Sequence, residues 1–461
     1  MSSSAPRIAI IGAGPAGLCL ARLLQLHSIN STVFEKDGSA AHRAAAGGSL
    51  DLHEDSGQAA LREAGLWDEF QRLARYDGQA YIISDHTGHR YCDTDADGIE
   101  DLGRPEIDRS QLRRMLLDSL APGTVRWGHK LSRAEPDGTL HFDVNVDAVA
   151  TTEDDDGAAR TENAAVVVEE RGFDLVVGAD GARSRIRPLL TTVPPMYSGL
   201  TGYELRLPAD IDAANPSVSR LVGNGSHFAF GQSADNQRCL CLQRQSDRSV
   251  CVYAFVREHA GWHARNGVAD HADVEAVRRL LLDDVYAGWA EGYKDVLRAA
   301  MPGWVLKREL WMMHVGTRWV HREGFTAVGD AAHLMTPFAG EGVNVALGDA
   351  LVLAREVAGA VEAVGGGGAG GGGVDVGGGG GGAVKRAVDG AVERYEKEMF
   401  PRAREFMQAT WDSMMERFEP GGNEKFAEGF RALAEERKNR EEGGKGEGKD
   451  GDRVDALFRR E

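Results

Sequence analysis

A glycine-rich turn between a short strand and a helix near the start of the chain constrains the fold more than any other feature. Ile8-Ala-Ile-Ile11 is an apolar run typical of a buried parallel strand, and a G-x-G-x-x-G pattern follows it directly. The first glycine permits the tight turn, the second leaves room for a pyrophosphate, and the third lets helix and strand pack closely. Glu35 lies 18 residues beyond the last glycine, where an acid binds a ribose hydroxyl. The sequence therefore predicts a Rossmann-type dinucleotide site formed by Gly12, Gly14, Pro15, Ala16, Gly17 and Glu35.

The context of this turn separates it from a chance match. Gly365, Gly367 and Gly370 have the same spacing, but they lie in a tract of almost pure glycine that no strand precedes. We therefore attribute the second match to composition. For the first match the alternative is a structural strand-to-helix turn without a ligand, and Glu35 at the expected distance disfavours it.

Two further motifs follow short apolar strands later in the chain. Asp174-Leu-Val-Val-Gly178 leads to Asp180-Gly181, which an ordinary tight turn would also explain. Phe325-Thr-Ala-Val-Gly329 leads to Asp330 and, after a loop, to Gly340-Glu-Gly-Val-Asn344 at the start of a helix. An acid at a strand end can bind polyol hydroxyls, and glycines at a helix N-terminus let the backbone approach a flat ring. The last motif therefore indicates a ligand site.

Together and in this order, the three motifs resemble those of the class A FAD-dependent aromatic-hydroxylase-type monooxygenases. The resemblance covers most of residues 7–364. It is closest to the tetracycline-inactivating subgroup, the tetracycline destructases, through Gly47-Gly-Ser-Leu-Asp-Leu-His53 and Pro105-Glu-Ile-Asp-Arg-Ser-Gln-Leu-Arg113. The resemblance implies FAD as the cofactor and NADPH or NADH as a co-substrate. The cofactor-binding residues that it implies beyond the first motif are Arg43, Asp51, Arg109, Asp180, Asp330, Gly340, Glu341, Gly342, Val343 and Asn344.

The middle of the chain departs from that subgroup, because its substrate-binding Gln, Arg and His have no matching residues here. The candidate substrate-pocket residues are Glu204, Tyr253, Met313, Pro337 and Phe338. Core packing is an alternative for the apolar run Trp311-Met-Met313 and for Phe338.

Several charged or titratable residues near the motifs have two interpretations. His333 could act as an acid–base group, but a hydrogen-bonded structural histidine is the simpler explanation. Arg183, Arg185 and Arg187 could meet the phosphate of NADPH or could form a solvated helix face, and the sequence favours neither.

The pattern of elements predicts an α/β fold. A Rossmann-type FAD-binding domain is interleaved with a mostly antiparallel β-sheet substrate domain, and a long C-terminal helix follows. Further helices are expected over Ser56–Leu73 and over 272–300. The expected segments are the FAD-binding domain in three parts (7–80, 101–189 and 319–364), substrate-domain strands 81–100, the substrate domain 190–318, a Gly-rich disordered loop 365–382, the C-terminal helix 383–418 and a charged tail 419–461.

Composition narrows the possible partners and the compartment. The net charge of −18 argues against nucleic acid and anionic membranes, because phosphate binding needs clustered Lys and Arg. The five cysteines are scattered without metal-binding spacing, which favours a reduced compartment and no metal site. With no signal peptide and no uncharged run of about 18 residues, we expect a cytoplasmic protein without a transmembrane segment. We also expect a monomer.

The resemblance implies a specific reaction. The protein would be a monooxygenase that consumes NAD(P)H and O₂ and hydroxylates a small, polycyclic aromatic or polyketide-like substrate through a C4a-hydroperoxyflavin. The flavin would carry the chemistry, so no catalytic side chain is required. The alternatives are a flavin-dependent dehydrogenase or reductase on the same fold, or a non-catalytic FAD-binding interaction protein.

Overall fold

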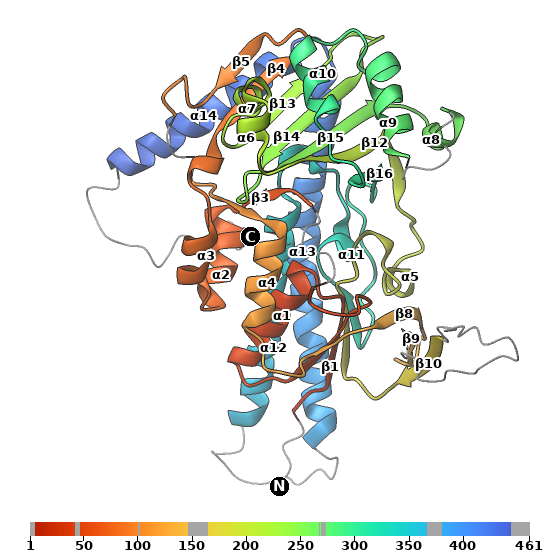
Figure 1. The fold of residues 1–461 in the computed structure, drawn as a ribbon. Coiled ribbons are helices and arrows are strands. Elements are labelled where there is room, and N and C mark those ends of the chain that lie inside the picture. The colour runs from red at the N-terminus through yellow and green to blue at the C-terminus, as the bar shows by residue number, and fades with distance from the viewer. Residues whose placement is uncertain are drawn as a thin grey trace, which may run out of the picture.

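The computed structural model describes residues 5–41, 47–99, 102–145, 165–266, 268, 273–366 and 380–443. Four sheets and a set of long helices organise these residues (Figure 1). The predicted α/β architecture, with a parallel sheet, a mostly antiparallel sheet and long C-terminal helices, is confirmed. Within the described residues, no helix combines the length and the apolar character needed to cross a membrane.

The glycine-rich turn belongs to a five-stranded parallel sheet. All four residues of β1 are buried, because helices cover one face of this sheet and a three-stranded sheet covers the other. The order in the parallel sheet is β17 (Phe325–Ala327), β11 (Leu175–Gly178), β1 (Ile8–Ile11), β2 (Ser31–Phe34) and β7 (Val125–Arg126). The covering sheet has the order β10 (Ala165–Glu170), β9 (Leu140–Asn145) and β8 (His129–Ala134).

A seven-stranded sheet forms the second large sheet and lies in the upper half of Figure 1. Its strands pair antiparallel except for β13 and β4, which run parallel. The order is β16 (Val305–Met312), β12 (Met196–Leu207), β15 (Val250–Arg257), β14 (Arg238–Arg244), β13 (Ser226–Phe230), β4 (Tyr81–Asp85) and β5 (Arg90–Asp93). A short pair, β3 (Ser49–Asp51) and β6 (Glu106–Asp108), lies between the two large sheets.

Helices cover the outer faces of both large sheets. The α-helices of the first half are α1 (Pro15–Leu26), α2 (Ala59–Glu63), α3 (Trp67–Leu73), α4 (Arg109–Asp118), α5 (Arg187–Leu190), α6 (Ile211–Ala214) and α7 (Pro216–Val222). Those of the second half are α8 (Trp262–Arg265), α9 (Val274–Leu280), α10 (Glu291–Arg298), α11 (Asp330–His333), α12 (Gly342–Gly366), α13 (Gly380–Arg417) and α14 (Gly422–Gly443). Short π or 3₁₀ turns are η1 (Glu54–Gln58), η2 (Asp77–Gln79), η3 (Gly181–Arg183), η4 (Leu281–Val285) and η5 (Pro337–Ala339).

Two long helices connect the layers. The helices α12 and α13 pack along each other, and α13 continues past Pro401 from the parallel sheet toward the seven-stranded sheet (Figure 1). The predicted C-terminal helix 383–418 therefore agrees closely with α13. The expected loop 365–382 lies mostly in residues 367–379, outside the described residues. Its two ends are helical instead, because residues 365–366 continue α12 and residues 380–382 begin α13.

Two long predicted helices are interrupted in the structure. The region Ser56–Leu73 breaks at Gly65, whose φ of +69° is favourable only for glycine. The region 272–300 breaks after η4, where Tyr286 turns inward and its hydroxyl donates to the carbonyls of Cys239 and Phe255. In both cases a residue with a non-helical role overrides the apolar periodicity.

The segment expected as a charged tail, 419–461, contains a helix that the sequence did not indicate, α14, over residues 422–443. Phe426 and Phe430, four residues apart, lie on one face of this helix and pack against Phe228 and Tyr81 of the seven-stranded sheet. These two rings give the helix an apolar contact with the sheet, although most residues of the segment are charged or polar. Residues 444–461 lie outside the described residues.

Candidate functional site

A single large cavity extends from the glycine-rich turn to the seven-stranded sheet. Its volume is about 2770 Å³. Pockets for one small ligand measure roughly 300–1,000 Å³, so this cavity has room for a dinucleotide-sized ligand and a second molecule. Residues from both large sheets, from the β3–β6 pair and from α12, α13 and α14 line it.

The glycine-rich turn opens onto one end of the cavity. Gly12, Gly14, Pro15 and Ala16 line the cavity, and no side chain caps the N-terminus of α1. Free N–H groups there make a ready anion site. Gly12 has a φ of +112°, and a Cβ on it would lie 2.4 Å from the carbonyl oxygen of Ala179, whereas a Cβ on Gly14 would meet nothing within 4 Å. The empty space at Gly14 is therefore space for a ligand.

Gly17 has a packing role. It does not line the cavity, and a Cβ there would lie 2.2 Å from the carbonyl oxygen of Gly12. Gly17 therefore supports the turn through close packing of helix and strand and does not face the ligand space.

Glu35 lies at the cavity wall, at the end of β2. Its carboxylate accepts hydrogen bonds from the backbone N–H groups of Ala13, at 2.7 Å, and Asp37, at 2.9 Å. Arg113, on the same face of α4 as Arg109, also lines the cavity and donates from Nε to the carbonyl of Ala13 at 2.9 Å. Sequence reasoning assigned no role to Arg113, although its spacing of four residues from Arg109 places both on one helix face.

The second motif forms a turn that braces the third. Asp180 lines the cavity, and its Oδ1 is buried without a hydrogen-bond partner in the described part of the chain. Burial raises the pKa of Asp180, although the Ser184 hydroxyl and the Arg185 N–H oppose this effect. Arg187 is buried and donates to the carbonyls of Ala331, at 2.8 Å, and Asp330, at 2.8 Å. Neither expected role of Arg187, a phosphate ligand or a solvated face, matches this contact.

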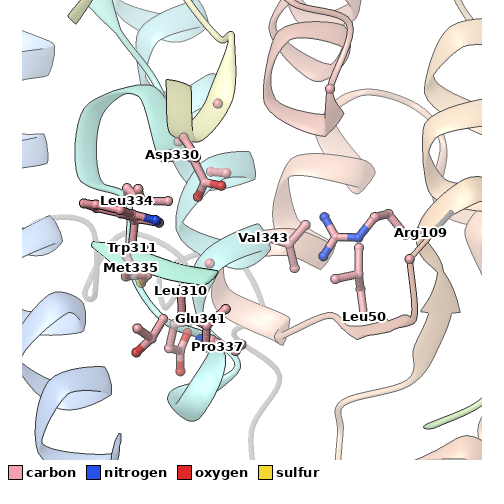
Figure 2. A pocket seen from close by; sticks show the side chains of 18 of the residues that line it. Leu50, Arg109, Leu310, Trp311, Asp330, Leu334, Met335, Pro337, Glu341 and Val343 are labelled. Atoms are coloured by element: carbon pink, nitrogen blue, oxygen red, sulfur yellow. The ribbon is translucent and has the colours of Figure 1, made fainter. Parts of the chain in front are cut away.

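Asp330, the first residue of α11, lines the cavity just after β17; the segment from Val328 to His333 is called the Asp330 loop below. Figure 2 shows its carboxylate and the Arg109 guanidinium approaching the same space from opposite sides, with Val343 between them. Although Asp330 is open to the cavity, desolvation by the surrounding walls raises its pKa, and the charges of His333, Arg109 and Arg187 oppose the shift. An acid in this position can accept hydrogen bonds from, or donate one to, a polyol chain.

A buried ionic cluster holds the Asp330 loop from behind. Asp349, on α12, accepts hydrogen bonds from the Gly329 N–H at 2.9 Å, from His333 Nε2 at 2.5 Å and from Arg402 of α13 at 2.9 Å. His333 is 2% exposed. The preferred interpretation of His333 as a hydrogen-bonded structural residue therefore agrees with the structure.

The loop before α12 meets β3 across the cavity floor. Gly340, Glu341, Gly342 and Val343 line the cavity, but Asn344 does not. Asn344 is fully buried; its side chain donates to the Asp51 carbonyl at 3.0 Å and accepts from the His53 N–H at 2.9 Å. The role of Asn344 as a cofactor contact stays a prediction, and its side chain does not face the cavity. Its amide instead satisfies backbone groups that join β3 to α12.

His53 links two acidic residues at this point. Its Nε2 lies 3.0 Å from Asp51 Oδ2 and its Nδ1 lies 3.3 Å from Glu341 Oε2. Burial alone would lower the pKa of His53, but hydrogen bonds and charges from Asp51 and Glu341 raise it to about 9. The imidazolium therefore clamps the cavity-lining acids of β3 and of the loop before α12.

We expect replacement of His53 by glutamine to destabilise the fold in a pH-dependent manner. Because the folded-state pKa lies above the ordinary value of 6.5, the stabilisation is fully present below pH 6.5 and is lost as the pH rises through about 9. The variant should lose about 2–3 kcal/mol of unfolding free energy at pH 6, and much less at pH 10. Urea denaturation at both pH values measures this, and an equal loss at both would contradict the clamp.

The seven-stranded sheet presents one face to the cavity and the other to helices. In register across five strands, Leu306, Glu204, Tyr253, Cys241 and Phe228 form a row that lines the cavity. The alternate residues of these strands pack against α7, α9 and α10 in a separate apolar core. The period-2 alternation of the sequence is thus divided between a core and a cavity wall.

Glu204 is the charged member of that row. Arg308, on the neighbouring strand β16, donates to its carboxylate from Nε at 2.9 Å and also from its terminal nitrogen. Of the other predicted substrate-pocket residues, Tyr253, Pro337 and Phe338 line the cavity and Met313 does not. Met313 is fully buried and packs with Leu334 and Met407, so its placement in the pocket is wrong.

Aromatic side chains surround the sheet end of the cavity. Most of them come from strands or helices whose role in a pocket the sequence did not indicate. They are Tyr81, Phe228, Phe230, Phe255, Phe426 and Phe430, in addition to Tyr253 and Phe338. Phe338, in the loop before α12, lies 6.4 Å from Phe230 between ring centroids, which joins the aromatic wall to the third motif. Arg43 lies outside the described residues.

Comparison with known proteins finds relatives in sequence and in fold. The family profile described as "FAD binding domain" matches residues 6–368. The monooxygenase asqM of Emericella nidulans is 31% identical over 465 residues, which cover 91% of this chain and 97% of that protein. The monooxygenase penA of Penicillium thymicola is 30% identical over 454 residues, which cover 91% and 96%. The structure of Klebsiella pneumoniae HpxO complexed with FAD and uric acid aligns with a TM-score of 0.64 at 18% identity, over 99% of this chain and 98% of that one.

The predicted closeness to the tetracycline-inactivating subgroup is not specific. The tetracycline destructase Tet(51) aligns with a TM-score of 0.57 at 16% identity, over 93% of this chain and 97% of that one. This likeness concerns the fold alone. The fungal monooxygenases match at about twice that identity over nearly the whole chain.

Proposed function

The chain belongs to the FAD binding domain family and is a class A FAD-dependent monooxygenase, and from this premise we propose that it hydroxylates a bulky aromatic substrate with NADPH or NADH as electron donor. The observation that carries the proposal is the continuity of the cavity. Its dinucleotide end and its aromatic end share one space, which Asp330 and Phe338 both line. A cofactor and an aromatic molecule held there would be in contact.

The residues of the dinucleotide end fit FAD. The open space at Gly14 and the uncapped N-terminus of α1 suit a pyrophosphate, and Glu35 suits a ribose. Asp330 and Asp180 both line the cavity and would supply polar groups near the polyol chain. The Oδ1 atom of Asp180 is buried and has no hydrogen-bond partner in the described part of the chain. Gly340–Val343, Asp51 and Arg109 would border the ring. When bound, FAD would carry electrons from the nicotinamide to dioxygen and would transfer one oxygen atom to the substrate.

The protein's own residues would position the substrate and exclude water. The aromatic side chains at the sheet end favour a flat apolar molecule and leave little for water to bind. The ion pair of Glu204 and Arg308 fixes the orientation of a charged group on one wall, because Arg308 donates twice to the Glu204 Oε2 oxygen. No acid or base among these side chains needs to enter the reaction.

The substrate that this geometry suits is a polycyclic aromatic or polyketide-like compound. A row of aromatic residues from β4, β13, β15 and α14 provides stacking faces over a length greater than one ring needs. Tetracycline itself is not proposed, because the substrate-binding residues of that subgroup have no match in the middle region.

The decisive experiment follows substrate-dependent consumption of NADPH and NADH by the purified yellow protein. We expect a hydroxynaphthalene or anthraquinone to accelerate oxidation of the nicotinamide at least about tenfold, and labelled dioxygen to place one oxygen atom in the product. Reduction of a compound without uptake of dioxygen would instead identify a reductase. Protein that lacks a flavin and fails to bind added FAD would exclude both reactions and leave an interaction protein.

A further inference from the structure

A buried arginine lies at the aromatic end of the cavity, where α13 ends and α14 begins. Arg417 is the last residue of α13, and its side chain is 9% exposed and lines the cavity. Its guanidinium carbon lies 3.6 Å from the centroid of the Phe426 ring. Phe426 in turn contacts Phe228 and Phe230 of the sheet, with ring centroids 5.7 and 6.3 Å away. The cation therefore lies within the aromatic wall.

The polar partners of Arg417 are few and distant. One terminal nitrogen lies 3.5 Å from Glu416 Oε2, at the limit of a hydrogen bond, and Nε is buried without a partner in the described part of the chain. Glu416 is itself engaged by Lys425, whose Nζ lies 2.9 Å from Oε1. Because burial dominates over the charge of Glu416, the pKa of Arg417 falls to about 10. The surroundings do not compensate the charge as a close carboxylate would.

The charge at this turn contrasts with the other charged side chains on the sheet wall. Glu204 is paired with Arg308, and Glu106 with Arg75. At the turn, Arg417 and Lys425 share one carboxylate, that of Glu416. Two cations therefore share one anion at this turn. An anionic ligand would bind favourably to the remaining positive charge, because the wall around it is largely apolar.

We propose that Arg417 binds an anionic oxygen group, a carboxylate or an ionised enol, on the aromatic substrate. Aromatic rings would stack on Phe228 and Phe230 while the guanidinium receives the oxygen anion. The proposal rests on the proposed function, and it narrows the substrate class to acidic aromatic compounds. Arg417 would be a specificity-determining residue with no role in the chemical step.

A purely structural role for Arg417 makes different predictions. Stacking on Phe426 could simply fix the turn between α13 and α14, where the Arg417 carbonyl also accepts a hydrogen bond from Gln232 at 3.3 Å. In that case the loss of the guanidinium would lower stability and weaken all aromatic ligands equally. It would not change the preference between an acid and its neutral amide.

The test is calorimetric titration of the FAD-loaded protein with 2-naphthoate and with 2-naphthamide, which differ in charge and hardly in shape. We expect naphthoate to bind at least about tenfold more tightly, and Arg417→Gln to remove this preference while changing amide affinity less than about twofold. Arg417→Lys should retain part of the preference. Lys307→Gln, which removes the same charge from the cavity-lining part of β16, is the matched control and should keep the preference.

A gain of function completes the test. Glu416→Gln removes the only carboxylate that competes for Arg417 among the described residues, so it should tighten naphthoate binding and leave the amide unchanged. Equal affinity for acid and amide in the unaltered protein, or equal losses for both in Arg417→Gln, would overturn the proposal. Because the readout is binding, an enzyme that binds naphthoate selectively and yet consumes no nicotinamide would refute the proposed reaction while leaving the anion site standing.

Discussion

Replacing Gly14 with valine is expected to abolish FAD binding without unfolding the protein. Gly14 has φ −82° and ψ 176°, a conformation that valine adopts readily, and its Cβ would project into open cavity space. The valine side chain would occupy the space that the pyrophosphate needs above the N-terminus of α1. Loss of the charge-assisted hydrogen bonds to the pyrophosphate should weaken FAD binding about 100-fold or more. FAD fluorescence quenching on titration of the apoprotein measures the dissociation constant.

Gly17→Val is the matched control within the same turn. Its Cβ would lie 2.2 Å from the Gly12 carbonyl oxygen, so it should destabilise the fold whether or not FAD is present. Gly14→Val should instead retain the unfolding free energy of the apoprotein within about 1 kcal/mol, the effect of a changed N-cap. If Gly14→Val binds FAD as tightly as the unaltered protein, the pyrophosphate does not lie at this turn.

Replacing Asp349 with alanine is expected to destabilise the protein by about 3–5 kcal/mol, because two buried basic side chains would lose a shared carboxylate. Burial alone would raise the pKa of Asp349, but His333 and Arg402 lower it below its ordinary value. The stabilisation is therefore present above pH 3.8 and is lost as the pH falls through the lower folded-state pKa. Chemical denaturation near pH 7 measures the loss.

The effect of Asp349 should extend to the cofactor. Its carboxylate accepts the N–H of Gly329, whose φ of +58° sets the direction of the chain into Asp330. A weaker grip on this loop should therefore also weaken FAD binding. Glu63→Gln is the control, because Glu63 pairs with Arg355 at the surface and its removal should cost less than about 1 kcal/mol. Similar losses for both variants would contradict a special role for the buried cluster.

Local sequence patterns were sufficient for the dinucleotide end of the site. The Gly12–Gly17 turn, Asp180, Asp330 and the Gly340–Val343 loop all line one cavity or support it, as their positions at strand ends suggested. Parallel strands bring their carboxyl ends to the same edge, so motifs far apart in sequence converge there. The resemblance to a family rests on the same motifs.

The aromatic end of the site could not be read from the sequence. Met313 and Phe338 have similar apolar contexts, yet one is core and the other lines the cavity, because only the pairing of β16 and the position of η5 decide which faces inward. Asn344 and Arg187 likewise belong to polar motifs, but tertiary contacts turn their side chains toward backbone carbonyls. Periodicity indicates which residues of a strand or helix face away from solvent. It does not show whether they face the core or a cavity.

The helix α14 shows the same limit most clearly. The spacing of Phe426 and Phe430 is a detectable signal, but the charge of the surrounding segment hides it, and only the face of β4 and β13 shows what the two rings pack against. By itself, the sequence determined the strand–turn–helix units and their order, because steric rules for glycine and the burial of short apolar strands act over a few residues. Only the tertiary structure decided which side chains close the aromatic pocket, because their burial depends on contacts between segments hundreds of residues apart.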